Sequence, residues 1–177
     1  YIELKRVAVE AKNHDEVIRY CNAILEVDAT NIEAWIDKAI STFWHTTGAN
    51  NRYDEAVEYL KKAAQIAPND TRIKNAFEAL TDSQAWWYNK LGKDEFERAV
   101  KVWNIYLPDS RSDAFPSLKD AKEHSQEHFS SAMNYFLIAT NYRPNDLTYL
   151  GNIAHCVKNA DWINWYDVVY ARIKRRD

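Results

Sequence analysis

The residues best suited to chemistry are two histidines and a glutamate in the last third of the chain. In His124-Ser125-Gln126-Glu127-His128 the two imidazoles are four residues apart, so on a helix they share one face and could hold a divalent metal ion. A third protein ligand and an open position for water would turn such a site into a metal-dependent hydrolase using His124, Glu127 and His128. The motif is therefore a catalytic candidate.

The surroundings of the motif favour a structural interpretation. Lys122 and Glu123 precede it in a polar run that is typical of a solvated helix face, and the residues after it are occupied by further predicted helices. The chain also has no G-x-x-x-x-G-K-[ST] or G-x-G-x-x-G segment to hold a phosphate. We expect no enzyme activity and no cofactor; adventitious zinc or nickel at His124 and His128 is the weaker alternative.

The elements that position these side chains are predicted to be entirely helical. Of 177 residues, 46% are hydrophobic and 28% charged, while only three are glycine and four proline, which leaves little material for turns. Apolar residues recur at helical spacing and nowhere alternate as in a strand. We predict an all-α fold, with a polar loop at 45–52, a helix end at Leu91-Gly92 and an irregular connection at 107–117. The predicted helices cover 2–11, 13–28, 31–44, 53–67, 71–91, 94–106, 118–127, 129–142, 147–159 and 161–175.

One spacing occurs four times along these helices. A small or apolar residue is followed by another four residues later, a third three residues after that, and a chain-breaking position five residues further on. Copies start 39, 40 and 36 residues apart, and such a period predicts units that stack into a surface instead of closing around a pocket. The four copies are Val17, Cys21, Ile24, Ala29; Ala56, Leu60, Ala63, Pro68; Phe96, Val100, Trp103, Pro108; and Ala132, Phe136, Ala139, Pro144.

These residues resemble the tetratricopeptide-repeat (TPR) family, whose unit is a helix-turn-helix with an A-x₃-F…P second helix. Ala132 and Phe136 match that pattern best, and the segment 53–70 resembles the second helix almost throughout. The chain departs from the family in two ways: segments 45–52 and 82–92 lengthen the period, and the third copy has large residues where small ones are usual.

The resemblance implies a right-handed α-solenoid of antiparallel helix pairs. We expect one TPR-like domain over 1–177 that belongs to a larger protein and binds a protein or peptide segment in a concave groove lined by the first helix of each pair. The approximate repeats are 1–31, 32–70, 71–110, 111–146 and 147–177.

In the register that the resemblance implies, the groove mixes charged, polar and apolar residues. An equally weighted alternative is that the three apolar ones pack beneath the 45–52 loop and meet no ligand. The family's clamp for a C-terminal carboxylate is not expected, because Asp37 would repel the ligand. The predicted groove residues are Arg6, Glu33, Ile36, Ile40, Phe43, Arg72 and Asn75.

Aromatic residues gather in two further places. Trp86, Trp87 and Tyr88, together with Trp103 and Tyr106, are interpreted as filling a wider gap between helices, the alternative being an exposed anchor for a partner. At the C-terminal end, Trp162, Trp165, Tyr166 and Tyr170 suggest a self-association surface, which would make the array an architectural element that spaces or dimerises flanking domains.

Net charge, hydropathy and cysteine content limit the partners and the cellular compartment that we expect for this chain. A net charge of −3 argues against a nucleic-acid partner, and no stretch has the roughly 20 apolar residues of a membrane span. Cys21 and Cys156 are predicted to be buried thiols, which suits a cytoplasmic protein. The chain begins at Tyr1 without a Met, so we expect a fragment from which a signal or anchor could have been removed.

Overall fold

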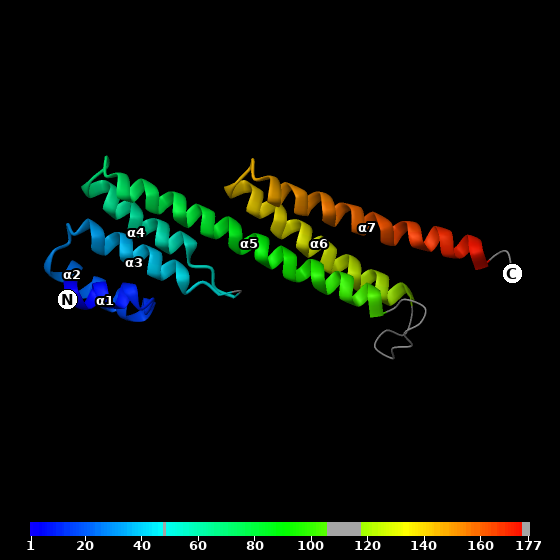
Figure 1. Ribbon diagram of the computed structural model, residues 1–177, viewed down its shortest axis with the longest axis horizontal. Coiled ribbons are helices and arrows are strands. Elements are labelled where there is room, and N and C mark those ends of the chain that lie inside the picture. Colours follow the sequence, from blue (N-terminus) through cyan, green and yellow to red (C-terminus); the bar gives the residue numbers. More distant parts are fainter. Residues whose placement is uncertain (48, 106–117, 175–177) are drawn as a thin grey trace. The chain divides into compact units, whose positions relative to one another are not determined.

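The computed structural model describes the backbone of residues 1–47, 49–105 and 118–174, and the side chains of residues 1–47, 49–104 and 120–161. These residues form helices and turns and no strand, so the all-α prediction is confirmed (Figure 1). The helices of the described part are α1 (Ile2–Glu10), α2 (His14–Val27), α3 (Ile32–Trp44), α4 (Tyr53–Ile66), α5 (Thr71–Ile105), α6 (Leu118–Tyr142) and α7 (Leu147–Lys174).

Short polar side chains begin several helices by accepting a hydrogen bond from a backbone N–H that has no partner inside the helix. Asn13 accepts from the amide of Glu16 at the start of α2, and Asn31 accepts from the amide of Ala34 in α3. Asp70 plays the same part before α5, where its carboxylate accepts from the amide of Arg72. The helix starts at these positions are therefore built from ordinary capping chemistry.

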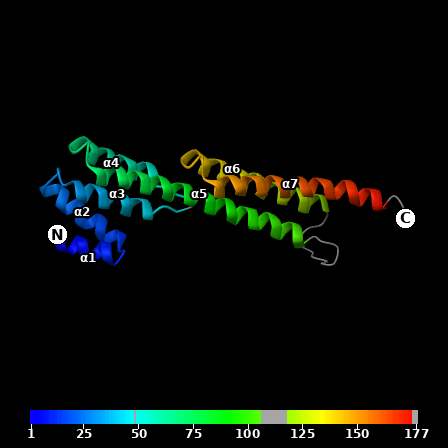
Figure 2. The same ribbon diagram turned by 45° about the horizontal axis from the view of Figure 1, so that its top comes forward.

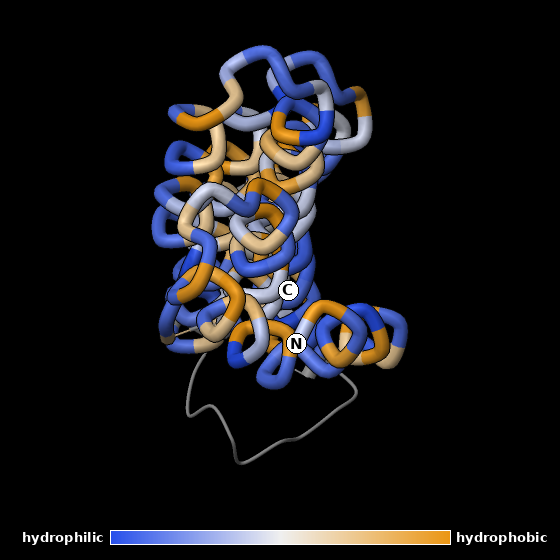
Figure 3. The backbone as a smooth tube through the Cα atoms, turned by 90° about the vertical axis from the view of Figure 1, so that its left-hand side faces the viewer, coloured by the Kyte–Doolittle hydropathy of each residue, from blue (hydrophilic) through white to orange (hydrophobic). Residues whose placement is uncertain are grey.

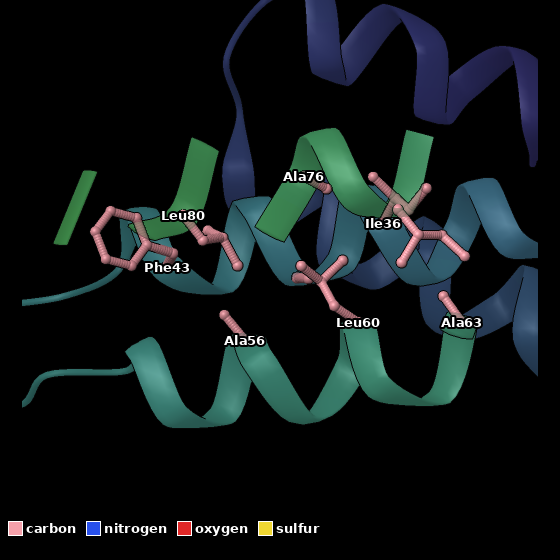
Figure 4. Packing of buried hydrophobic residues seen from close by; sticks show 9 residues of the cluster. Ile36, Phe43, Ala56, Leu60, Ala63, Ala76 and Leu80 are labelled. Carbon is pink, nitrogen blue, oxygen red and sulfur yellow. The ribbon is translucent and has the colours of Figure 1, made fainter. Parts of the chain in front are cut away.

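The chain divides into two compact units, residues 1–83 and 84–177, with the boundary inside α5. In the first unit α2 packs against α1 and α3, and α3 packs against α4 (Figure 2). Figure 4 shows Leu60 of α4 directed toward Ile36 of α3, with Phe43 beside Leu80 of α5. Alanines at positions 56, 63 and 76 complete this core and let the helix backbones come close together.

The apolar spacing that occurs four times in the sequence identifies buried core residues in three of its four copies. In the first, second and fourth copies the three helical positions are all at most 7% exposed. In the third copy Phe96 and Val100 are only partly buried, and Trp103 is the buried member. In the second unit Ala85 and Ala99 of α5 have no exposed surface, and the larger Gln84 is fully buried as well.

The predicted helix end at Leu91-Gly92 is wrong, because α5 continues through it without interruption. Gly92 serves packing instead of termination. A Cβ atom at this position would lie 2.5 Å from Cε1 of Phe136 in α6, closer than real Cβ contacts come. The glycine thus gives the Phe136 ring room against the backbone of α5, and the ring is only 2% exposed.

The two later helix breaks are also wrong. The expected pair 118–127 and 129–142 is one helix, α6. The expected pair 147–159 and 161–175 is also one helix, α7, as far as residue 174; position 175 and the 107–117 connection lie outside the described residues. Neither junction contains a proline, and a helix without one can run on through a short polar stretch. Within the described residues, only the first two predicted repeats therefore show two separate helices each.

Polar atoms join the helices of the second unit at close range. The Ser125 hydroxyl of α6 donates to the backbone carbonyl of Ala99 in α5 at 2.9 Å, and Cys156 of α7 donates to the carbonyl of Phe129 at 3.4 Å. The Asn152 amide donates to Asn89 at 2.6 Å. A side chain can reach a mid-helix carbonyl in this way only where the helices approach closely, which small side chains allow.

Both cysteines are free and fully buried, as predicted. Burial raises the pKa of Cys21 to about 12 and that of Cys156 to about 11, so neither thiol is ionised at neutral pH. Among the described residues, no helix is both long enough and apolar enough to cross a lipid bilayer. In Figure 3 hydrophobic and hydrophilic residues are mixed along the visible parts of the tube.

The packing role of Gly92 predicts that alanine destabilises the chain at position 92 but stabilises it at the control position, Gly151. Gly92→Ala should lower the free energy of unfolding by about 1–3 kcal/mol, because the new methyl group overpacks against Phe136. Gly151→Ala should raise it by about 0.5–1 kcal/mol, because a Cβ atom on that helical glycine would meet nothing within 4 Å and alanine is the better helix former. Urea unfolding followed by circular dichroism measures both; equal effects would contradict the packing role of Gly92.

Candidate binding surface

The charged and polar residues of the predicted groove lie on the surface of the first unit. Arg6, Glu33 and Arg72 have side chains that are 61%, 65% and 59% exposed, and Asn75 is exposed as well. They come from three helices, α1, α3 and α5, which are the helices that the TPR register assigns to the groove. These side chains are accessible to a partner.

Two of the three apolar groove residues belong to the core. Ile36 is 9% and Phe43 4% exposed, and both belong to a core cluster with residues of α4 and α5. Ile40 is partly buried at the edge of the same cluster. Of the three apolar residues predicted for the groove, only Ile40 is exposed enough to contact a ligand. The candidate binding surface is therefore more polar than the sequence suggested.

A buried lysine that the sequence analysis missed connects α1 to α3. Lys5 is only 3% exposed, and its ammonium donates to Glu33 at 2.6 Å and to Asp37 at 2.5 Å. The interaction explains why two acidic residues stand together on α3: they neutralise a cation from the neighbouring helix. The signal in the sequence was Asp37 itself, an acid at a groove position with no assigned partner.

The charges on this face alternate from helix to helix. Burial lowers the pKa of Lys5, but the hydrogen bonds to Asp37 and Glu33 outweigh that effect, so the pKa lies above its ordinary value of 10.5. The hydrogen bond from Lys5 in turn lowers the pKa of Glu33, and the charge of Arg72 adds a smaller effect in the same direction. Lys5, Glu33 and Arg72 therefore form one electrostatic row across α1, α3 and α5, which Asp70 extends through its ion pair with Arg72.

Two exposed apolar side chains of α1 share a helix face with Arg6. Ile2 and Val9 are 62% and 43% exposed, and with Arg6 they follow the four-then-three spacing that places residues on one helix face. Val9 is also one turn beyond Lys5, beside the contact with α3. We call the face formed by Ile2, Arg6, Val9, Glu33, Asp37, Ile40, Arg72 and Asn75 the first-helix surface.

The histidine motif sits in the second unit and is tied to α5. The Nδ1 atom of His128 lies 2.6 Å from Oε2 of Glu95, and both side chains are largely covered. His124 is half exposed, with its ring 5.1 Å from that of His128 and its Nδ1 atom 3.5 Å from Glu127. Within the part of the chain that the structure describes, no group of three or more His, Cys, Asp or Glu side chains could hold a metal ion.

The aromatic residues of α5 divide between core and surface. Trp103 is 8% exposed in the core, and the Tyr88 ring stacks on Tyr135 and Tyr142 of α6 at centroid distances of 6.3 and 6.2 Å. Trp86 is 51% exposed beside Lys90. Tyr106 and the side chains of Trp162, Trp165, Tyr166 and Tyr170 lie outside the described residues.

The buried ammonium of Lys5 generates a stability prediction. Lys5→Ala should lower the free energy of unfolding at neutral pH by about 1–3 kcal/mol, because Asp37 loses its charged hydrogen-bond partner. Lys74→Ala, which removes an exposed lysine from α5, should change it by less than about 0.5 kcal/mol. Urea unfolding followed by circular dichroism measures both variants, and similar losses would show that Lys5 has no special role.

The same network predicts a pH dependence. Glu33 has a lowered pKa, so its contribution is present above its ordinary value of 4.5 and disappears as the pH falls through the lower folded value. Lys5 has a raised pKa, so its contribution disappears only as the pH rises through a value above 10.5. The difference in the free energy of unfolding between the wild-type chain and Lys5→Ala should therefore be smaller at about pH 3 than at neutral pH. An equal difference at the two pH values would contradict the network.

No protein-family model and no curated protein matches this chain, so the resemblance to TPR proteins stays an interpretation of its residues.

Proposed function

We propose that the chain is a TPR-like helical-repeat module without enzyme activity, part of a larger protein, and that its first-helix surface binds an extended protein segment. The observation that supports this most directly is the charge row of Lys5, Glu33 and Arg72, which joins three helices on one face. A solenoid of antiparallel helix pairs would produce such a face, because its first helices lie side by side. The two buried free thiols suit a cytoplasmic setting.

The chemistry of the surface indicates the kind of segment it would accept. It exposes charges of both signs, on Arg6, Glu33 and Arg72. A segment with charges of both signs would therefore find a complement, whereas a uniformly charged one would not. Ile2, Val9 and Ile40 add apolar contacts beside the charges. The half-exposed His124 and the covered His128–Glu95 pair provide no comparable reaction site.

Binding at this surface can be tested with peptides selected from a displayed random library against the wild-type chain. Arg72→Glu should lower the affinity for the selected peptides by about tenfold or more, because it reverses one charge in the row. Arg19→Glu is the matched control: Arg19 is 65% exposed, belongs to the same unit and also pairs with an acid of its own segment, but lies on α2. Isothermal titration calorimetry gives the affinities. Equal affinities for the two variants would overturn the assignment of the surface.

A second candidate function is self-association, and the exposed face of α7 favours it. Leu147, Leu150 and Val157 are 83%, 42% and 43% exposed, and with the exposed Ala154 they follow the three-then-four spacing of a helix-packing seam. A second copy of the chain could cover this stripe, and the array would then dimerise flanking domains. The C-terminal aromatics that first suggested self-association follow on the same helix.

Self-association through α7 predicts a concentration-dependent change in sedimentation coefficient that Leu150→Glu removes, because a charge in the seam would be buried without a partner. Leu137→Glu serves as the control, since Leu137 is an exposed leucine of α6 with 49% exposure. Sedimentation velocity at several protein concentrations measures both. A wild-type chain that stays monomeric throughout would remove this candidate.

A further inference from the structure

An aromatic pair on the surface of the first unit is held rigidly by its own polar atoms. The rings of Trp35 in α3 and Tyr59 in α4 stack with their centroids 5.9 Å apart. The indole N–H donates to the carbonyl of Ala29 at 2.9 Å, and the phenol donates to Glu55 at 2.9 Å. Both rings are partly exposed, so this is a fixed platform at the protein surface.

Two lysines sit on this platform. The ammonium of Lys38 lies 4.4 Å from the Tyr59 centroid and 5.5 Å from that of Trp35, and the ammonium of Lys62 lies 5.0 Å from Trp35 and 6.0 Å from Tyr59. Each cation is attracted to the ring faces. The arrangement therefore concentrates two positive charges over one pair of rings.

No carboxylate neutralises the two lysines directly. Among the described residues neither forms an ion pair, and the nearby acid Glu55 is engaged by two guanidinium nitrogens of Arg52 at 2.7 and 2.8 Å. Burial, and then the charge of Lys62, lower the pKa of Lys38, and the charge of Glu55 offsets only part of that lowering. The other cations of this unit that do have acidic partners are Lys5, Arg6, Arg19, Arg52, Lys61 and Arg72.

The platform is unsuited to a nucleobase. Base stacking needs an open aromatic face, and here the rings cover each other and carry the lysine side chains. An anionic group placed between the two ammonium groups would instead relieve their repulsion, and the ring edges would contact the aliphatic part of an acidic side chain. The net charge of −3 means that the rest of the protein does not attract anions in general, so such binding would be local.

We propose that Lys38 and Lys62, on the Trp35–Tyr59 platform, form a binding site for the carboxylates of an acidic protein segment. The site is separate from the first-helix surface: Trp35 is two residues from Glu33, and Lys38 two from Ile40, a turn of about 200° around α3. The proposal therefore does not depend on binding at that surface, and the chain could hold two segments at once.

The test uses the full chain and a fluorescein-labelled octapeptide of alternating glutamate and serine, with fluorescence anisotropy at about 20 mM salt, where surface charges are weakly screened. Lys62→Glu should weaken binding by about tenfold or more, because it removes one ammonium and pairs the other. Lys61→Glu is the matched control: it is the adjacent residue, it makes the same change in net charge, and its side chain is 57% exposed. It should weaken binding by less than about twofold.

Two further measurements keep the result decisive. A peptide with glutamine in place of glutamate should not bind, and the urea midpoint of Lys62→Glu should equal or exceed that of Lys61→Glu, because the new carboxylate lies beside Lys38. Equal weakening by the two variants would show non-specific attraction and overturn the site. So would a wild-type chain that does not bind the acidic peptide at concentrations up to about 1 mM, the affinity range of a weak complex.

Discussion

The ring of Phe136 lies so close to the backbone at Gly92 that no side chain at position 92 would fit. Close approach of neighbouring helix backbones is the constraint on which both units depend. Each helix buries its apolar residues against its neighbours, so the backbones must come close. In the first unit Ala39, Ala56 and Ala63 satisfy that requirement, each with no exposed surface. In the second unit Gly92 and Ala99 do so on α5, and there the hydroxyl of Ser125 reaches a main-chain carbonyl of the neighbouring helix.

The helical character of the chain could be read from its sequence, but the helix ends in the second half could not. Helical spacing of apolar residues and Asn13 or Asn31 as caps are local signals, and the structure follows them. Leu91-Gly92 carries the same local signal as a helix end, yet the helix continues. What requires a glycine at position 92 is the ring of Phe136, which is far away in the sequence, and local patterns contain no information about such a neighbour.

The candidate surface shows the same division. Arg6, Glu33 and Arg72 could be placed on the outside because charged residues at first-helix positions are rarely buried. Ile36 and Phe43 could not be assigned, because an apolar residue has the same type whether it faces a ligand or a neighbouring helix. Lys5 was missed for the opposite reason: a lysine is expected at the surface, and only the two acids of α3 make its burial tolerable.

The two cysteines have a practical consequence for following the motions of this chain. Cys21 belongs to the first compact unit and Cys156 to the second, and each is free and without exposed surface. A thiol reagent can reach either sulfur only after its own helices separate, and the raised pKa values keep the thiols unreactive until then. Each unit thus carries a built-in reporter, and the labelling rates of the two sulfurs would show whether the units open together or independently.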